Sequence, residues 1–480
     1  MTTPLSLPEE PAVYKSLVKA AVPVARLGQL LTVIRGVTYK KEMARSKPAD
    51  GFVALLRATN IQQSLGFDEL VYVPDSCVSE SQLLRAGDIL VVASSGSRTV
   101  VGKAAPLTHP WRGSFGAFCF ALRPNAGVDP TYIAAFLRSP GYRDRVSDLA
   151  AGTNINNLRA SHIEETPIPL PTTDRQRKIV ASLDEQLSRL DASVAALHRV
   201  QANLKRYRAS VLKAACEGRL VPTEAELARQ QGRDFEIGAQ LLQHILVERK
   251  RASKAQRQYV EPAPVSRGEM STLPEGWALA SLDELAWHSS YGTSAKCSPT
   301  ASGAAVLRIP NVDRGNIDTT DMKYSAEALD ATSSAALKPG DMLIIRTNGS
   351  KSLIGRGAIV QLEFSAPTTF ASYLIRFRLT AAISRKWLGL FWQSPAARGW
   401  VEARASTSAG QHNVSMSVLA TAPVPLPPLA EQHRIVAEAD RRLSLIRAAE
   451  AQVAANLARS QRLRQSILQA AFAAPASAGQ

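Results

Sequence analysis

The chain lacks the features that mark exported, membrane-spanning or metal-binding proteins. Its four cysteines, Cys77, Cys119, Cys216 and Cys297, lie far apart and form no C-x-x-C pair, which argues against a zinc or redox site of that type. The N-terminus carries two acids and no apolar signal segment, and the longest uncharged run, residues 405–430, contains four prolines that would break a spanning helix. We therefore expect reduced thiols and a cytoplasmic protein with no membrane partner.

Familiar catalytic motifs are also missing. The seven histidines show no H-E-x-x-H spacing, and no N-P-P-Y or G-x-G-x-x-G element occurs. The segment 100–105, V-V-G-K-A-A, resembles a phosphate-binding loop only superficially, because Lys103 is not followed by Ser or Thr. Asp88 and Asp341 lie at turns that precede strands, where we expect a structural rather than a catalytic role. We expect no catalytic residues, no metal and no cofactor in this chain.

What the chain does contain is length, apolar residues and positive charge. Its 480 residues suggest two to four domains, and 45% hydrophobic residues suffice for real cores. Lys and Arg number 57 against 41 Asp and Glu, a formal net charge of +16. Such an excess favours nucleic acid as the partner, although it could also serve solubility alone.

An internal repeat determines the architecture. Residues 179–215 align without a gap with residues 435–471 at a constant offset of 256. Upstream, G-D-I-L-V-V (87–92) matches G-D-M-L-I-I (340–345), and Phe115 matches Phe370 at an offset of 255. The chain is therefore two copies of one unit, each a globular part with variable spacers followed by a long helix.

The repeated helix has the apolar heptads of a coiled coil. At about 1.5 Å per residue, its 36 heptad-bearing residues span roughly 54 Å, comparable to about 16 base pairs. The alternative is two independent amphipathic helices, each packed on its own domain. The residues predicted to pair the two helices are Leu183, Leu187, Leu190, Val194, Leu197, Leu443, Ile446, Val453 and Leu457.

The fold class predicted is α+β, with two α/β domains in tandem repeat, separated by two long antiparallel coiled-coil helices. The predicted boundaries are a first domain at 1–171, a central spacer helix at 172–221, a basic linker with a helical segment at 222–270, a second domain at 271–428 and a C-terminal spacer helix at 429–480. The basic run 249–257 in the linker is expected to be solvated surface or a phosphate contact.

Paired loops in the two copies offer donors for DNA. The loops that follow the G-D strands combine glycine with hydroxyl, amide and cationic groups, and a second pair of loops supplies amides that suit adenine edges. Arg-x-x-Asn segments at strand ends could read guanine, and ordinary surface turns are the alternative throughout. The candidate DNA-binding residues are Arg57, Asn60, Ser95, Ser97, Arg98, Thr153, Asn154, Asn156, Arg308, Asn311, Arg346, Asn348, Ser350, Lys351, Gln411, His412 and Asn413.

Taken together, several motifs give the chain a family resemblance. They are the G-D-x-L strands, L-P-E-G-W at 273–277, E-G-R-L-V-P at 217–222, G-Q-H-N-V at 410–414, P-V-P-L-P-P-L-A-E-Q-H-R-I-V at 423–436 and R-Q-S-I-L-Q-A-A-F at 464–472. With these motifs the chain resembles the specificity (S) subunits of type I restriction-modification enzymes. The first copy departs from the pattern, with T-T-D-R-Q-R-K-I-V at 172–180 and G-T-N-I-N-N at 152–157.

The resemblance implies a non-catalytic, sequence-specific subunit of a type I restriction endonuclease and adenine-DNA methyltransferase complex. Two target-recognition domains would each read half of a bipartite double-stranded DNA sequence, and the helices would act as a ruler. The partners implied are two methyltransferase (M) subunits and, in restricting assemblies, restriction-translocase (R) subunits. S-adenosylmethionine, ATP and Mg would be used by those partners. The residues alone leave two alternatives, a standalone nuclease or methyltransferase with an unrecognised site and a structural coiled-coil adaptor.

Overall fold

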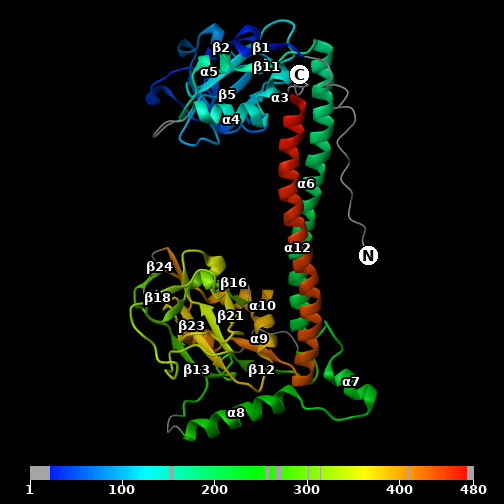
Figure 1. The fold of residues 1–480 in the computed structure, drawn as a ribbon. Helices are drawn as coiled ribbons and strands as arrows, with labels where there is room; N and C mark the ends of the chain where they lie inside the picture. The colour runs from blue at the N-terminus through cyan, green and yellow to red at the C-terminus, as the bar shows by residue number, and fades with distance from the viewer. Residues whose placement is uncertain are drawn as a thin grey trace, which may run out of the picture. The chain divides into compact units, whose positions relative to one another are not determined.

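The computed structural model describes residues 22–150, 156–255, 259–265, 273–300, 302–313, 315–408 and 410–472. The chain divides into two compact units (Figure 1). Unit 1 comprises residues 1–198 with 454–480, and unit 2 comprises residues 199–453. Each unit contains one globular domain and part of both long helices, so the prediction of tandem α/β domains is confirmed.

Unit 1 is built on a four-stranded antiparallel sheet in the order β2-β9-β5-β7. Its strands are β2 (Leu31–Arg35), β5 (Ile89–Val92), β7 (Ala104–Pro106) and β9 (Cys119–Pro124). Strand β5 is apolar throughout because both of its faces are covered: Ile89 and Val91 pack into one cluster and Leu90 and Val92 into another. The G-D segment therefore opens a buried strand, as predicted.

Helices cover one face of this sheet and a smaller sheet covers the other. The helices are α2 (Leu27–Leu30), α3 (Pro130–Phe136), α4 (Pro140–Leu149) and α5 (Ala160–Glu164). Strands β4 (Val71–Pro74), β3 (Phe52–Leu56) and β8 (Ser114–Phe115) form the smaller sheet, and β1 (Val24–Arg26) pairs with β11 (Pro167–Pro169). Asp129 and Ser139 cap α3 and α4, each followed by a proline at the first helical position.

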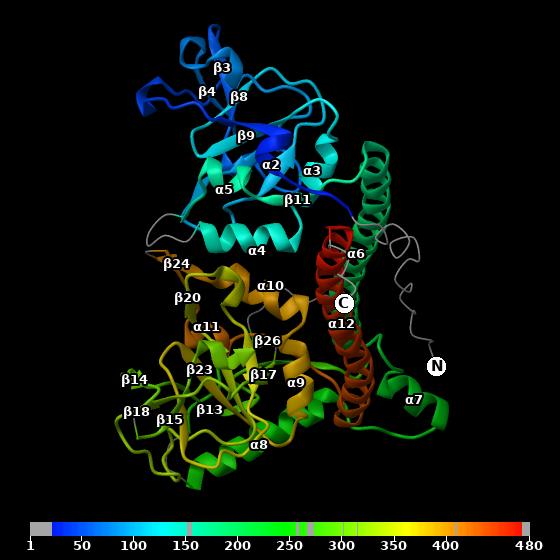
Figure 2. The ribbon, with the colours of Figure 1, turned by 45° about the horizontal axis from the view of Figure 1, so that its top comes forward.

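Unit 2 repeats the plan with the same strand order, β13-β23-β19-β21. These strands are β13 (Ala286–Tyr291), β19 (Asp341–Ile345), β21 (Gly357–Ile359) and β23 (Leu374–Leu379). As in unit 1, alternate residues of the buried strand enter different clusters, Met342 and Ile344 on one face and Leu343 and Ile345 on the other. Helix α9 (Arg385–Trp392), labelled in Figure 2, contacts β21. The sequence repeat is thus a structural repeat.

The remaining elements of unit 2 complete the correspondence. The second sheet consists of β14 (Cys297–Ser298), β18 (Lys323–Ser325), β15 (Ala305–Leu307) and β22 (Thr368–Phe370). Strand β12 (Ala278–Ser281) pairs with β26 (Pro423–Leu426), as β1 pairs with β11. The short elements are β16 (Val312–Asp313), β17 (Asn316–Ile317), α10 (Pro395–Arg404) and α11 (Met416–Ala420). The Pro-x-Pro segments at 167–169 and 423–425 lie in β11 and β26, one strand of each of these pairs.

The two long helices, α6 (Thr173–Cys216) and α12 (Leu429–Phe472), have 44 residues each. In unit 1 Leu183 and Leu187 pack in one cluster with Leu468, and in unit 2 Val211 and Leu212 pack in one cluster with Ile435. The early part of one helix therefore meets the late part of the other, which makes the pair antiparallel. Both clusters also contain residues of the globular domain, so in each unit the two helices share a core with that unit's domain.

The predicted seam residues line this arrangement. Leu183, Leu187, Leu190, Leu443, Ile446 and Val453 are buried, while Val194, Leu197 and Leu457 are partly buried. Helix α6 ends at Cys216, five residues before the predicted end of the spacer at 221, because Gly218 adopts a positive φ of 66° that a helix cannot continue through. Residues 473–480 of the predicted C-terminal helix lie outside the described residues.

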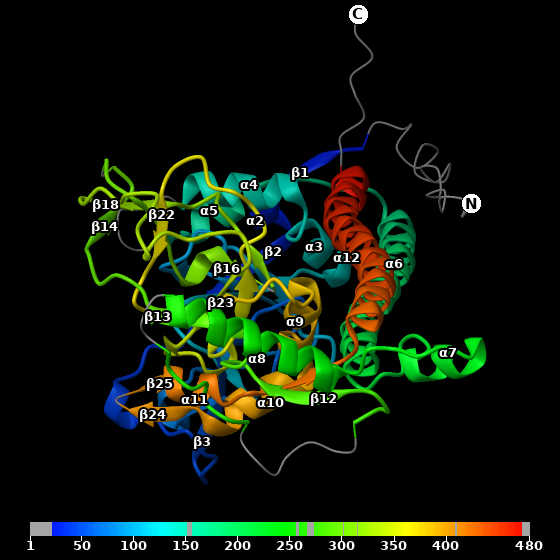
Figure 3. The same cartoon turned by 90° about the horizontal axis from the view of Figure 1, so that it is seen from below.

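The linker contains two helices, whereas the sequence indicated one helical segment. Helix α7 (Glu224–Gln231) begins with a capping box between Thr223 and Glu226. Helix α8 (Gly238–Ala255) contacts β12, which Figure 3 labels beside it, and also contacts β26. Arg249, expected in a solvated basic run, is 8% exposed and donates hydrogen bonds to the carbonyls of Asp283 and Ala286. Arg249 therefore anchors α8 to the second domain.

Candidate nucleic-acid interface

In unit 1, two of the predicted loops are joined by a short pair of strands. Strand β6 (Ser94–Ser95) pairs with β10 (Asn156–Asn157), so that Ser95 lies opposite Asn156. The Asn156 amide is 5% exposed and donates to the carbonyls of Ser95 and Gly96 at 3.4 Å. Asn156 thus fastens the loop, while Ser97 and Arg98 are exposed at its tip. Thr153 and Asn154 lie outside the described residues.

The equivalent loops of unit 2 form a three-stranded sheet in the order β20-β25-β24. Strands β20 (Thr347–Asn348), β25 (Gln411–Asn413) and β24 (Ser406–Ser408) place Asn348 opposite His412. Asn348 accepts a hydrogen bond from the backbone of Ser350 at 2.8 Å, and His412 Nδ1 lies 2.9 Å from Thr407 Oγ1. Gln411, Ser350 and Lys351 are exposed, and Asn413 is half-buried.

Strand β24 was not among the sequence candidates. Thr407 and Ser408 add exposed hydroxyls to the same small sheet, directly beside His412 and Gln411. The S-T-S segment has no apolar periodicity and no charge, so the sequence did not indicate a strand there. It forms one through antiparallel pairing with β25. Its position just before the predicted G-Q-H-N-V loop was the available sequence indication.

Arg346 links this sheet to the neighbouring strand. Its guanidinium carbon lies 4.8 Å from the centre of the Tyr291 ring, a cation–π arrangement, and its backbone N–H donates to the Tyr373 carbonyl at 2.9 Å. Arg346 is half-buried rather than fully extended into solvent. The candidate loop of unit 2 therefore carries Arg346 and Lys351, one cation packed at its base and one exposed.

The two Arg-x-x-Asn segments have a structural role that the sequence analysis did not assign. Asn60 is 6% exposed; its Oδ1 accepts from the Arg57 backbone at 2.9 Å and its Nδ2 donates to the Asp68 carbonyl at 2.8 Å. The Arg57 guanidinium donates to the Glu69 carbonyl at 2.9 Å. Both atoms of this amide are occupied within the protein, so Asn60 presents no free amide to a base edge.

The second copy repeats this loop closure. Asn311, 1% exposed, accepts from the Arg308 backbone at 2.8 Å and donates to the Asp318 carbonyl at 2.8 Å. Arg308 pairs with the Asp321 carboxylate at 2.9 Å. We therefore do not carry Arg57, Asn60, Arg308 or Asn311 into the interface. The repeat of these segments is visible in the sequence, but the direction of their side chains could not be predicted from it.

A buried ion pair supports the strand that leads to each loop. Asp88, 1% exposed, accepts two hydrogen bonds from Arg123, and Asp341, 1% exposed, accepts two from Arg378. These hydrogen bonds raise the pKa of both arginines. Each aspartate also accepts a backbone hydrogen bond from the residue three positions earlier, Arg85 or Lys338, which closes the turn. The predicted structural role of the two aspartates is confirmed.

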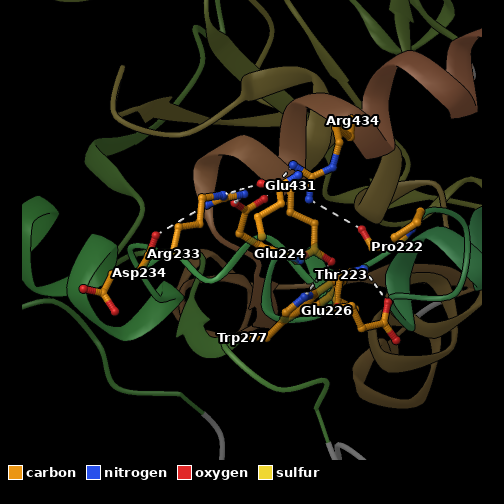
Figure 4. A network of polar contacts seen from close by, with 10 residues as sticks. Pro222, Thr223, Glu224, Glu226, Arg233, Asp234, Trp277, Glu431 and Arg434 are labelled. Carbon is orange, nitrogen blue, oxygen red and sulfur yellow. Dashed lines mark hydrogen bonds and ion pairs between the residues drawn. The ribbon is translucent and has the colours of Figure 1, made fainter. Parts of the chain in front are cut away.

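Unit 2 contains a polar network where three of the sequence motifs meet (Figure 4). Glu431, fully buried, accepts from Trp277 Nε1 at 2.9 Å and from the Glu224 backbone at 2.8 Å. Burial raises the pKa of Glu431, partly offset by these hydrogen bonds. The network joins the linker, the L-P-E-G-W segment and the start of α12, which explains why the three motifs occur together. The first copy has Arg175 in place of Glu431 at offset 256.

The Glu224 carboxylate is the second centre of this network. It contacts Arg233 at 2.5 Å and Arg434 at 2.6 Å, with its side chain 4% exposed (Figure 4). Burial alone would raise the pKa of Glu224, but the hydrogen bonds from the two arginines outweigh it and lower the pKa. The linker is thus bound to the beginning of α12 by charge as well as by packing.

Within the described ranges, no three His, Cys, Asp or Glu side chains gather in a group that could hold a metal ion. None of the described helices is long and apolar enough to cross a membrane.

Comparison with known proteins identifies the family. Residues 22–204 match the family model described as type I restriction modification DNA specificity domain. The chain is 32% identical to the type I restriction enzyme EcoKI specificity subunit of Escherichia coli K12 over 451 residues, covering 94% of this chain and 88% of the relative. The chain belongs to the specificity subunits of type I restriction enzymes. This specificity subunit is also 32% identical to the StySPI specificity subunit of Salmonella potsdam, over 93% of this chain and 88% of the relative.

A solved structure supports the fold of this specificity subunit. A chain from a study of complex assembly and conformational transition of the type I R-M system superimposes with a TM-score of 0.60 at 18% identity, covering 95% of this chain and 99% of that one. This likeness concerns the fold, and the two relatives at 32% identity confirm the family resemblance inferred from the motifs. Neither alternative, the standalone enzyme or the coiled-coil adaptor, is supported by these relatives.

Proposed function

We propose that this specificity subunit binds double-stranded DNA and determines which sequence its complex modifies. Each unit reads one half of a bipartite target through its pair of joined loops, and the chain itself carries out no catalysis. Among the described residues, the candidates that remain for base or phosphate contact are Ser97 and Arg98 in unit 1 and Ser350, Lys351, Gln411 and His412 in unit 2. Ser95, Asn156, Arg346, Asn348 and Asn413 shape the loops, and Thr153 and Asn154 stay predictions.

The observation that carries the proposal is the duplication of the loop pair. In both units the segment after the buried G-D strand pairs with a segment that follows a helix, Ser95 with Asn156 and Asn348 with His412. The two pairs have different side chains on the same backbone frame. Equivalent frames with different donors suit the recognition of two different half-sites.

The helices are proposed to set the distance between the half-sites. Both α6 and α12 are continuous across the border between units, and 44 residues at about 1.5 Å each make roughly 66 Å. A paired helix of fixed length favours one spacing over others, because bending or melting it would cost its packed seam.

The proposed partners and compartment follow from this role. We infer that the chain holds two methyltransferase subunits and, in restricting assemblies, restriction-translocase subunits, and that it works in the cytoplasm. Those subunits would use S-adenosylmethionine, ATP and Mg. The net charge of +16 is consistent with a phosphate-binding surface.

The proposal is tested by selection from a pool of random DNA duplexes. The full chain, purified with the methyltransferase subunits of its host, is mixed with the pool, and the bound duplexes are sequenced. The expected result is two short blocks of fixed sequence separated by a degenerate gap of constant length. A single block, or no enrichment, would show that the chain does not read a bipartite site.

A further inference from the structure

An aromatic side chain is exposed at the same place in both units. Phe118 is 66% exposed and Tyr373 is 54% exposed, and an offset of 255 places one on the other. Phe118 is the only phenylalanine among the described residues with so exposed a side chain. Large aromatic rings normally contribute to the core, so two equivalent exposed rings call for a function.

In unit 1 the ring lies in a turn attached to the base of the candidate loop. The Cys119 backbone N–H donates to the Gly116 carbonyl at 2.9 Å, which closes a turn with Phe118 at its third position. The Phe118 carbonyl accepts from Ala93 at 2.8 Å and from Ser94 at 3.2 Å. Ala93 and Ser94 are the residues through which strand β5 passes into the loop strand β6. The ring is therefore anchored where the loop begins.

Unit 2 builds the same turn from different residues. The Leu374 backbone N–H donates to the Ala371 carbonyl at 2.9 Å, again with the aromatic residue at the third position. The Tyr373 carbonyl accepts from Arg346 at 2.9 Å, between strands β19 and β20. Since this backbone arrangement is kept while the side chains vary around it, the exposed position itself is a repeated feature of the unit.

A glycine holds each turn from the other side. A Cβ on Gly36 would lie 2.1 Å from the Gly116 carbonyl oxygen, and a Cβ on Gly292 would lie 2.2 Å from the Phe370 carbonyl oxygen. Only glycine allows the backbone to approach so closely. Each aromatic residue is thus fixed between a candidate DNA loop and a glycine contact, and its backbone has little freedom to withdraw the ring.

We propose that Phe118 and Tyr373 are specificity-determining residues that contact DNA bases. Each ring enters the groove beside the polar loop of its own unit and packs against a base, by contact with a thymine methyl group or by partial stacking at a base step. The neighbouring polar loop supplies polar contacts to phosphates and bases, and the ring adds an apolar contact that depends on the base. The inference rests on the proposed function of the two units in DNA reading.

DNA fits these positions better than a protein partner does. The rings stand beside loops rich in hydroxyl, amide and cationic groups, Ser97 and Arg98 in one unit and Ser350 and Lys351 in the other. In unit 2 a second exposed ring, Tyr291, packs against Arg346 next to Tyr373. A protein-binding surface is expected to gather several apolar side chains at its centre. One or two rings among hydroxyl, amide and cationic groups suit a DNA groove better than a protein surface.

The test uses Phe118→Ala and Tyr373→Ala in the full chain, purified with the methyltransferase subunits. Phe118→Tyr and Tyr373→Phe keep the ring, and Val24→Ala and Leu362→Ala remove exposed apolar side chains elsewhere in the two units. Affinity is measured at several salt concentrations for a duplex selected by the wild-type complex and for a scrambled duplex. Selection from the random pool is repeated with each variant, and thermal unfolding verifies that each variant is folded.

Each alanine variant should bind the selected duplex about 10-fold more weakly, with the scrambled duplex and the salt slope unchanged. Phe118→Ala should weaken the base preference at positions of one block only, and Tyr373→Ala at positions of the other block. The ring-keeping and control variants should behave like wild type. Should one alanine variant unfold, the alanine variant in the other unit still tests the inference.

Three results would overturn the inference while leaving the proposed function intact. They are unchanged affinity and unchanged blocks, an equal loss on both duplexes, and loss of the methyltransferase subunits from the purified complex, which would make the rings a protein contact. Failure of the wild-type complex itself to enrich any sequence would instead refute the proposed function.

Discussion

Arg123 donates two hydrogen bonds to Asp88, from Nε at 2.9 Å and from Nη2 at 2.7 Å, across 35 residues of sequence. The pair joins the turn that opens β5 to the end of β9, and so fixes the central sheet from which the candidate loop of unit 1 extends. Arg378 and Asp341 form the same two-fold contact in unit 2. The frame that presents the candidate loops is thus held by the same ion pair in each half.

The first prediction concerns these ion pairs. Asp88→Asn should lower the free energy of unfolding of unit 1 by about 3 kcal/mol, since it leaves Arg123 without its charge partner. Asp341→Asn should cost more, because Arg376, which is 1% exposed and lies 3.8 Å from Asp341, also loses its nearest carboxylate. The measurement is hydrogen exchange by mass spectrometry on the full chain, following β9 and β23.

Protection should fall mainly in the unit that carries the substitution, with Asp148→Asn, an exposed carboxylate in unit 1, as the control. Equal effects of the two buried substitutions would show that Arg376 does not depend on Asp341.

The second prediction concerns the exposed cations of the loops. Arg98→Ala and Lys351→Ala should each weaken DNA binding on every sequence and reduce the slope of log affinity against log salt by about one. Arg229→Ala is a suitable control, because Arg229 already pairs with Glu275 at 2.7 Å. The slope is obtained by titrating one duplex at several salt concentrations. A variant that changed base preference but kept the wild-type slope would place that cation on a base edge instead.

The third prediction concerns pH and the Glu224 network. The pKa of Glu224 is lowered in the folded chain, so the stability it contributes is present above its ordinary pKa and is lost as pH falls through the lowered value. Glu224→Gln should therefore destabilise the chain by roughly 2 kcal/mol at neutral pH, and the difference from wild type should shrink below about pH 4. Denaturant midpoints of both proteins across this range provide the measurement.

Glu431 acts in the opposite direction, because its raised pKa favours the protonated form on folding as pH falls. Because the Glu224 charge is one cause of the raised pKa of Glu431, the difference between Glu224→Gln and wild type reports the two coupled carboxylates together. Glu275→Gln, at an exposed ion pair, should show almost no difference at any pH. A Glu224→Gln difference that stayed constant down to pH 3 would mean that the carboxylate charge does not hold α7 to α12.

Features of the chain that depend on local pattern could be predicted from the sequence. The heptad pattern predicted the long helices, because the spacing of apolar residues determines which face is buried. The G-D strands were recognisable from turn residues that precede an apolar run. The pairing of Ser95 with Asn156 and of Asn348 with His412 joins loops that had been selected separately as candidates. Repetition in the sequence made those loops comparable before their geometry was known.

Features that depend on the direction of a side chain could not be predicted. Asn60 and Asn311 carry the amide groups that could bind a base edge, and only their burial shows that they close loops instead. Phe118 precedes C-F-A-L, four buried residues, so it resembles the start of a core strand although it is exposed. Helix α7 is only 8 residues long and mostly polar, and it depends on its cap and on Arg434 rather than on periodicity.

The central claim is that the two units determine the half-site sequences and the paired helices determine their spacing. Asp191 of α6 pairs with Arg464 of α12, which places residues 192–198 opposite residues 457–463 in the antiparallel pair. Removing both seven-residue segments keeps the heptad register and shortens the pair by about 10 Å, close to 3 base pairs.

The decisive measurement is methylome sequencing of a host that expresses either the wild-type chain or this paired deletion. The same two half-sites with a gap shorter by about 3 base pairs is the predicted result. Changed half-site sequences, or the original spacing retained with full methylation, would contradict the account.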